Sequence, residues 1–158
     1  PAMAIRKLAE LNDTLRPGHR LLGLDLGEKT IGLALSDTTL MIATPMTTLK
    51  RGKFSNDAKT LADLIDEHCI GALVIGLPIN MDGSEGPKCQ SVRQFAQNLL
   101  ERFETEICFW DERLSTVAVT RTMIEADISR AKQKEAVDKM AAAYILQGAL
   151  DFLQHQTG

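Results

Sequence analysis

Two short apolar runs joined by a polar link constrain the fold of this chain more than any other feature. Residues 21–26 and 31–36 have the length and composition of β-strands, and the link at residues 27–30 begins with glycine. This spacing and turn chemistry predict a β-hairpin. The first run carries Asp25 near its centre. A lone carboxylate in a buried strand is costly unless it is paired or bound to a metal, so Asp25 needs a partner.

The rest of the chain alternates strands with helices. A third strand is predicted near residues 46–49, and short apolar runs at 72–77 and 107–110 predict two more. Apolar residues at helical spacing predict helices between residues 55 and 68, from Pro87 onward, at 115–126 and at 133–153. The order β-β-β-α-β-α-β-α-α favours an α/β fold of the ribonuclease H-like arrangement. We therefore expect a mixed five-stranded sheet with helices on both faces.

The length of 158 residues fits one domain with a sizeable core. Residues 1–19 hold a short amphipathic segment that ends in the turn at residues 16–18. We expect this segment to be an N-terminal extension and residues 20–158 to form a single ribonuclease H-like domain.

Composition excludes several classes of protein. No apolar run approaches the length that crosses a bilayer, and the first twenty residues lack a secretory pattern, so we expect no membrane association and a cytoplasmic location. The three cysteines have no paired spacing for zinc or a redox couple. A net charge of −3 argues against indiscriminate coating of nucleic acid, although a local basic patch is compatible with it.

The strand around Asp25 predicts an open surface beside its carboxylate. Side chains alternate along a strand, so Asp25 shares one face with Gly23 and Gly27. Bare glycine leaves room for a phosphate or a metal ion, which favours a role as metal ligand or phosphate-positioning group. The alternative is a structural aspartate that caps the backbone or pairs with a buried arginine.

Two further acidic positions pose the same question. Asp138 begins an apolar stripe of the last predicted helix, and this stripe should face the sheet: Ala141, Ala142, Ile145, Ala149 and Phe152. Its alternative role is a favourable interaction with the helix dipole. The run 111–113 (Asp-Glu-Arg) follows a strand, where open α/β sheets place their ligand crevices. A solvated charged turn is the alternative there.

Together these acids indicate divalent-metal hydrolysis of phosphodiesters. Two ions can activate a water and stabilise the leaving oxygen, and carboxylates from separate elements are needed to hold them. An all-oxygen site favours Mg²⁺ or Mn²⁺. Because like charges packed together raise one another's pKa, a metal would also explain how several ionised acids coexist.

Several motifs resemble the YqgF family, also called RuvX. They are LGLDLG at 22–27, VIGLP at 74–78, MDGSEGP at 81–87, VRQFA at 92–96, DERLST at 111–116 and the late Asp138. Members are described as candidate Holliday junction resolvases and as nucleases for the 5′ end of the small-subunit ribosomal RNA precursor. The resemblance extends from about residue 20 to residue 153, and it implies Asp25, Glu112 and Asp138 as catalytic acids and metal ligands.

The distance between strands leaves two candidates for the second acid of this implied site. In ribonuclease H order the strand before Glu112 lies two places from that of Asp25, about 10 Å away. The longer glutamate side chain would cover much of this gap, whereas Asp111 would reach less far, and both remain candidates for the second acid.

Cations gather at predicted connections. Residues 50–53 and 130–134 each hold three cations without an acid, and the loop at 78–86 leads to further cations. Such segments can follow a phosphate backbone, or they can be ordinary solubilising loops. We predict that nucleic acid contacts Lys50, Arg51, Lys53, Lys88, Arg93, Arg113, Arg130, Lys132 and Lys134. Trp110 and Tyr144 lie in core-like patterns, so we expect no base-stacking platform.

The sequence thus predicts a metal-dependent endonuclease whose best substrate is the 5′ end of pre-16S rRNA during ribosome biogenesis. A Holliday junction resolvase acting on branched DNA is an alternative, as is a non-catalytic adaptor that binds RNA or ribosomal precursor particles. The hairpin also resembles the phosphate loop of the actin, Hsp70 and sugar-kinase superfamily, but those proteins need a second such domain, for which 158 residues leave no room.

Overall fold

The predicted hairpin forms the centre of the molecule in a computed structural model, which describes residues 5–114 and 130–157. Strands β2 (Arg20–Leu26) and β3 (Thr30–Ser36) pair antiparallel, with Asp25 opposite Gly32. Strand β4 (Ala43–Lys50) pairs antiparallel with β3 and completes the meander. The three strands expected from the first part of the chain are therefore present.

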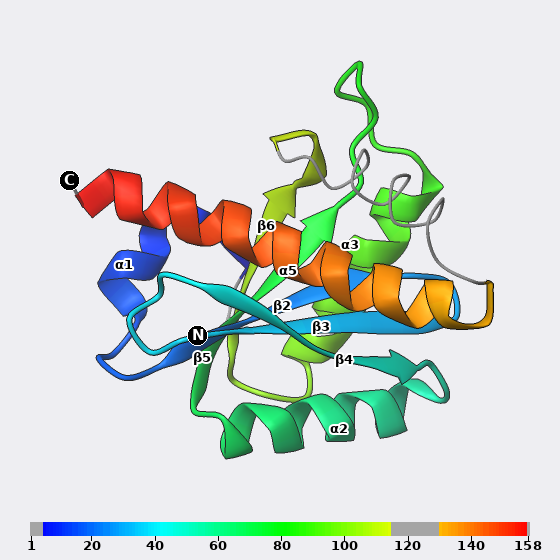
Figure 1. The fold of residues 1–158 in the computed structure, drawn as a ribbon, viewed down its shortest axis with the longest axis horizontal. Helices are drawn as coiled ribbons and strands as arrows, with labels where there is room; N and C mark the ends of the chain where they lie inside the picture. Colours follow the sequence, from blue (N-terminus) through cyan, green and yellow to red (C-terminus); the bar gives the residue numbers. More distant parts are fainter. Residues whose placement is uncertain (1–4, 115–129, 158) are drawn as a thin grey trace.

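Parallel strands extend the sheet on the other side of β2. Strand β5 (Ile70–Leu77) pairs with β2, and β6 (Glu106–Asp111) pairs with β5. The crossovers contain helices α2 (Phe54–Glu67) and α3 (Pro87–Leu100), the latter opened by the predicted proline. The five predicted strands and the mixed α/β architecture are confirmed (Figure 1).

A sixth strand, which the sequence did not predict, lies at one edge. Strand β1 (Ile5–Arg6) pairs parallel with β6, so the sheet order is β1-β6-β5-β2-β3-β4. It is followed by the short helices η1 (Leu8–Glu10) and α1 (Leu11–Thr14). Leu11 is fully buried in a core cluster, so the N-terminal segment packs against the sheet.

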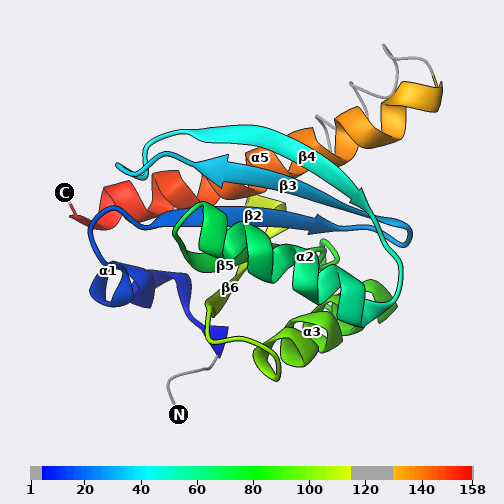
Figure 2. The same ribbon diagram turned by 90° about the horizontal axis from the view of Figure 1, so that it is seen from below.

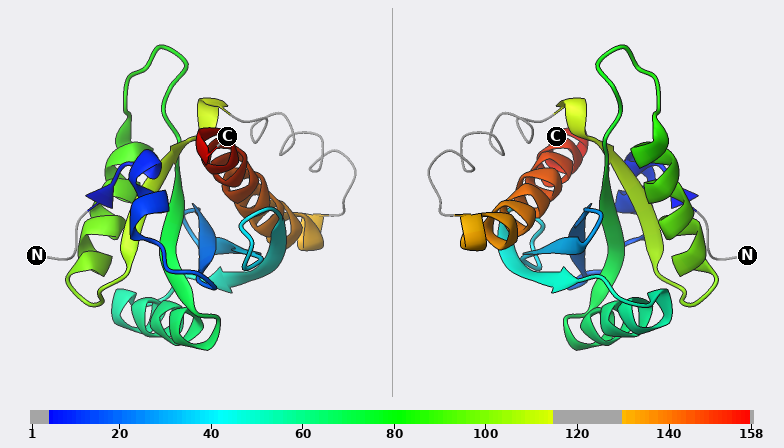
Figure 3. Two further views of the ribbon diagram at one scale, coloured as in Figure 1. Left: turned by 90° about the vertical axis from the view of Figure 1, so that its left-hand side faces the viewer. Right: turned by 90° about the vertical axis from the view of Figure 1, so that its right-hand side faces the viewer.

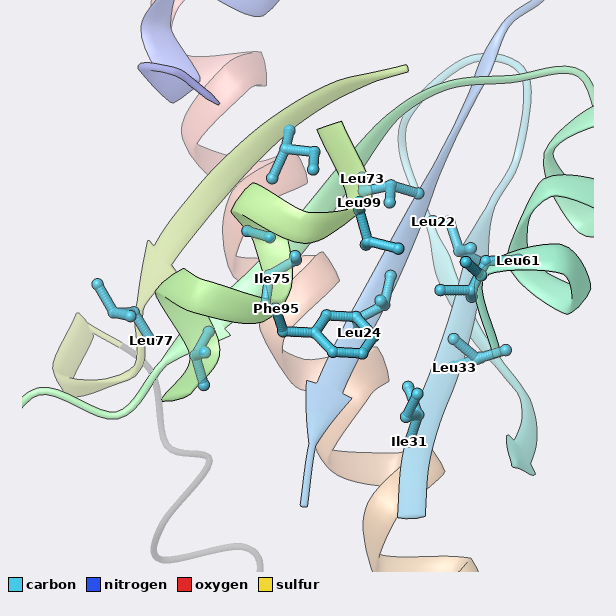
Figure 4. Close-up of a cluster of buried hydrophobic side chains, with 14 of the residues drawn as sticks. Leu22, Leu24, Ile31, Leu33, Leu61, Leu73, Ile75, Leu77, Phe95 and Leu99 are labelled. Atoms are coloured by element: carbon cyan, nitrogen blue, oxygen red, sulfur yellow. The ribbon is translucent and has the colours of Figure 1, made fainter. Parts of the chain in front are cut away.

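Helices cover both faces of the sheet. Helices α2 and α3 pack on one face, and the long helix α5 (Arg130–Thr157) crosses the other (Figures 2 and 3). Apolar side chains of β2, β3 and β5 meet those of α2 and α3, among them the labelled Leu24, Leu61 and Phe95 (Figure 4). None of the helices in the described ranges carries an apolar stretch long enough for a bilayer.

The sheet-facing stripe of α5 is confirmed in its first part and wrong at its end. Ala142, Ile145 and Ala149 are fully buried, but Phe152 is 40% exposed. The buried side of the helix turns toward Leu150 and Leu153 near its C-terminus, and these leucines fill the core instead. The helix predicted at 115–126 lies outside the described residues.

The two large polar aromatics have different environments. Trp110 is buried as expected, and Gly148 of α5 packs directly on its indole ring, where a Cβ atom would lie 2.7 Å from the ring. Tyr144 is 37% exposed, so its predicted core position is wrong. It sits on the side of α5 that points away from the sheet, between the buried positions before and after it.

Candidate active site

Asp25 lies on the α5 face of the sheet and is only 7% exposed. The face follows from its neighbour in the strand alternation, Gly23. A Cβ atom at Gly23 would lie 2.8 Å from the Cβ of Leu146 in α5. Because alternate residues share a face, the Asp25 carboxylate points to the same side. Gly23 therefore shares the face of Asp25 as expected, but α5 covers this glycine and leaves no open space beside it.

Glycines flank Asp25 on both neighbouring strands. Gly32 of β3 is its direct partner, and Gly76 of β5 follows Ile75, the partner of Leu24. A Cβ atom at Gly76 would lie 2.4 Å from the side chain of Ile145 in α5, so Gly76 faces the same side. We call Gly32, Asp25 and Gly76 the glycine-lined surface. Without side chains at the two flanking positions, other groups can approach the Asp25 carboxylate closely.

Asp138 reaches this surface from α5. Its carbonyl oxygen would lie 2.0 Å from a Cβ atom at Gly32, so the helix backbone rests on that glycine. The side chain is 9% exposed, and its Oδ2 accepts a hydrogen bond from the hydroxyl of Thr30 at the start of β3. Asp25 and Asp138 therefore lie on the same face beside Gly32, although 113 positions separate them in the sequence.

Glu112 approaches from the opposite side. It begins the short helix η2 (Glu112–Leu114) directly after β6, two strands away from β2 as expected. Its Oε2 atom lies 3.2 Å from the Cβ position of Gly76. The side chain therefore extends over β5 and covers about one strand spacing, roughly 4.8 Å, of the gap to Asp25.

Asp111 has a different environment. Trp110 packs in the cluster beneath α5, so strand alternation turns Asp111 to the other face. Its carboxylate accepts hydrogen bonds from Nε of Arg113, at 3.1 Å to each oxygen, and from Nη2, at 2.7 Å to Oδ2. These bonds, more than the charge of the guanidinium, lower the pKa of Asp111. The geometry thus brings Glu112, and not Asp111, toward Asp25.

Thr30, Gly32 and Gly76 belong to this site but were not predicted from the sequence. A threonine at the start of a strand is common, and nothing in the local sequence of Thr30 marks a contact with a helix that begins a hundred residues later. The two glycines carry a weak signal, because glycine inside a strand often marks close approach by another backbone.

The site offers oxygen ligands from separate elements. Within residues 5–114 and 130–157, no three His, Cys, Asp or Glu side chains are grouped so that they could hold a metal ion. Mg²⁺ nevertheless fits such a surface, because it commonly takes one or two protein carboxylates and keeps several waters that substrate phosphates replace. Asp25 and Asp138 are the carboxylates closest to these requirements.

Four of the predicted nucleic-acid contacts lie near the same end of the sheet. Lys50, Lys53 and Lys88 are exposed. Arg51 donates from Nη1 to the carbonyl oxygen of Gly27 at 2.6 Å, and its guanidinium lies 5.2 Å from the ring centroid of Phe95.

Two predicted contacts are engaged in internal ion pairs. Arg93 makes two hydrogen bonds to Glu85, at 2.6 and 2.8 Å, and stacks over the ring of Phe109. These hydrogen bonds lower the pKa of Glu85 and raise that of Arg93. Arg113 binds Asp111 as described above. Both arginines therefore have structural partners in addition to any contact with nucleic acid.

The prediction that the three remaining cations lie in a connection between elements is wrong. Residues 130–134 form the first turns of α5. A run of charged and polar residues at a helix start carries no apolar stripe from which a helix can be recognised. The side chains of Arg130, Lys132 and Lys134 lie outside the described part of the structure.

Comparison with known proteins gives the family. A family model described as RuvX, Holliday junction resolvase, matches residues 19–152. Relatives from Rhodospirillum centenum and Paramagnetospirillum magneticum, both named as candidate pre-16S rRNA nucleases, are 59% and 60% identical. The alignments cover 96% and 94% of this chain and 84% and 96% of the relatives.

Solved structures support the fold independently. RuvC from Thermus thermophilus, alone and in complex with a Holliday junction substrate, gives TM-scores of 0.52 and 0.53 at 11% identity. These comparisons cover 86% and 89% of this chain and 96% of RuvC. The motifs, the sheet order and the family match agree, and the chain belongs to the RuvX (YqgF) family of resolvases and nucleases.

Proposed function

We propose that this nuclease hydrolyses phosphodiesters with divalent metal ions at the glycine-lined surface, with Asp25, Glu112 and Asp138 as its acids. The observation that carries the proposal is the docking of Asp138 on Gly32, next to Asp25. Burying two carboxylates on one face is unfavourable unless a cation or hydrogen bonds compensate their charge. One Asp138 oxygen is bound by Thr30, which fixes the orientation of the carboxylate.

The three acids would bind metal from different sides of the glycine-lined surface. Asp25 and Asp138 would hold Mg²⁺ or Mn²⁺ between β2 and α5, and Glu112 would contribute its carboxylate from the β5 side. When bound, such ions activate a water and stabilise the leaving oxygen. Gly32 and Gly76 carry no side chains of their own, so the Asp138 backbone and the Glu112 side chain can approach the strand on either side of Asp25.

We propose the 5′ end of pre-16S rRNA as the substrate, because the relatives at 59% and 60% identity carry that activity in their names. Branched DNA is the second candidate, because the matching family model is described as a Holliday junction resolvase. Binding to ribosomal precursor particles and a cytoplasmic location remain predictions.

Cleavage of both substrates by the wild type and by Asp25→Asn tests the proposal. Loss of a residue that merely orients a metal ligand costs about 10- to 100-fold, so loss of the ligand itself should exceed ~100-fold. The matched control is Asp63→Asn on the exposed side of α2, which should cleave like the wild type. Equal cleavage by Asp25→Asn would refute the site. Binding without cleavage by the wild type, with Mg²⁺ or Mn²⁺ present, would establish the adaptor instead.

A further inference from the structure

A small pocket opens at the carboxyl end of β2, on the sheet face opposite to Asp25. It measures about 90 Å³ and is lined by hairpin residues 26–28, by Arg51 and Pro78, and by Lys88, Ser91 and Val92 of α3. Leu26 and Val92 pack in the core cluster beneath α3, which places the pocket on that side. Its remaining lining includes the charged Glu28, Arg51 and Lys88 and the polar Ser91.

Arg51 is held in place at the pocket wall. One N–H group of its guanidinium donates to the carbonyl oxygen of Gly27, and Phe95, which is 5% exposed, supports the guanidinium face. A guanidinium has five N–H donors in a rigid plane. Its orientation is therefore fixed before a ligand arrives, and further donors remain for an anion.

Lys88 and Ser91 complete the polar wall. They are three residues apart on α3, so their side chains lie on the same side of the helix. Both side chains are exposed, and the helix start at Gly86 has no side-chain cap. Glu28 is the one acid among the lining residues. Two cations against one acid leave a charge of about +1 at neutral pH.

We propose that this pocket binds a backbone phosphate of the strand that is cleaved at the glycine-lined surface, an inference that rests on the proposed function. A phosphodiester carries one negative charge, which matches the pocket. Asp25 and Leu26 are consecutive residues that face opposite sides of the sheet. A strand bound at both places therefore passes over the carboxyl edge of β2 and places phosphates on its two sides.

Salt-dependent binding in the Asp25→Asn background tests the pocket without cleavage. Fluorescence anisotropy with a labelled single-stranded RNA gives the slope of log K against log [salt], which changes by ~0.7 for each phosphate contact. Lys88→Ala should reduce the slope by that amount and weaken binding on the order of fivefold at low salt. Lys88→Arg should restore both values. The matched control Lys59→Ala, an exposed lysine of α2, should leave them unchanged.

Equal slopes for Lys88→Ala and Lys59→Ala would overturn the proposal. Inorganic phosphate is the second probe, followed through the amide signals of Gly27, Lys88 and Ser91. Shifts of these signals by RNA at concentrations where phosphate causes none support a strand site. Shifts by phosphate alone, with RNA affinity unaffected by Lys88→Ala, show a free-anion site and overturn it. Cleavage by the wild type is measured separately, so loss of the hydrolytic proposal is recognised independently of the pocket.

Discussion

Asp111 and Glu112 are adjacent in the sequence, yet their carboxylates make different contacts. Asp111 is tied to Arg113 on one side of the sheet, whereas Glu112 extends over Gly76 on the other. Consecutive residues of a strand face opposite sides of the sheet, and Glu112, which directly follows the last residue of β6, continues this alternation. Exchange of either acid should therefore affect a different property of the protein.

Glu112→Gln should lower the cleavage rate by at least ~100-fold, because the amide is a poor substitute for a ligand carboxylate. Asp111→Asn should retain cleavage within about threefold and lower the free energy of unfolding by about 1 kcal/mol or less, since the pair with Arg113 is partly exposed. Single-turnover cleavage and urea denaturation measure the two effects. The opposite pattern, with Asp111→Asn inactive, would identify Asp111 as the second acid.

Thr30 is expected to act as a positioning residue for Asp138. Thr30→Val keeps the shape of the side chain but removes the donor to the buried carboxylate. We expect metal affinity to fall about 10- to 100-fold, as for other residues that orient a metal ligand, and Thr30→Ser to restore it. Calorimetric titration with Mn²⁺ reports the effect directly. Unchanged affinity in Thr30→Val would exclude this role.

A site residue can be predicted from the sequence when its signal lies in the residues next to it in the chain. Asp25 can be recognised as a site residue from its own strand, because a carboxylate among apolar residues is costly to bury without a partner. The partners of Arg93 and Thr30 could not be predicted, because they depend on how a loop and a distant helix are placed. Such contacts leave no periodic signal in the chain.

Strands and helices were predicted where their own residues specify them. The hairpin, α2 and α3 have turn residues and apolar periodicity, and their positions are confirmed. Strand β1 is two residues long and has no pattern to detect, and it exists only through its pairing with β6. The start of α5 was missed because its first turns are charged and polar.

Helix α5 depends on glycine where it meets the sheet. Gly32→Ala would place a methyl group against the backbone of Asp138, and overpacking of this kind costs about 1–3 kcal/mol. We expect both a lower free energy of unfolding and slower cleavage, because the helix and its carboxylate must move away.

The matched control for this effect is Gly52→Ala, at which a Cβ atom would meet nothing within 4 Å. Its stability should stay within about 1 kcal/mol of the wild type. Urea denaturation of the two variants measures the difference. Wild-type stability and activity in Gly32→Ala would show that the helix does not rest on this glycine.

The molecule as a whole consists of one sheet between two apolar layers, and its N-terminal segment belongs to one of them. Leu11 is fully buried among residues of the sheet and of α5. Leu11→Ala should therefore cost about 2–5 kcal/mol of unfolding free energy. The neighbouring exposed Asn12→Ala should change it by less than about 0.5 kcal/mol. Equal stabilities in urea denaturation would show that the segment is a detachable extension.

The contact of α5 with Gly32 also bears on how this protein can change in evolution. Main-chain atoms of Asp138 contact Gly32 directly, whereas elsewhere along α5 the side chains of Leu146 and Ile145 contact the sheet glycines. We expect exchanges among apolar core side chains of similar volume to have little effect on the position of Asp138. A side chain at position 32 would meet the backbone of Asp138, so we expect this position to tolerate fewer substitutions than the apolar core positions around it.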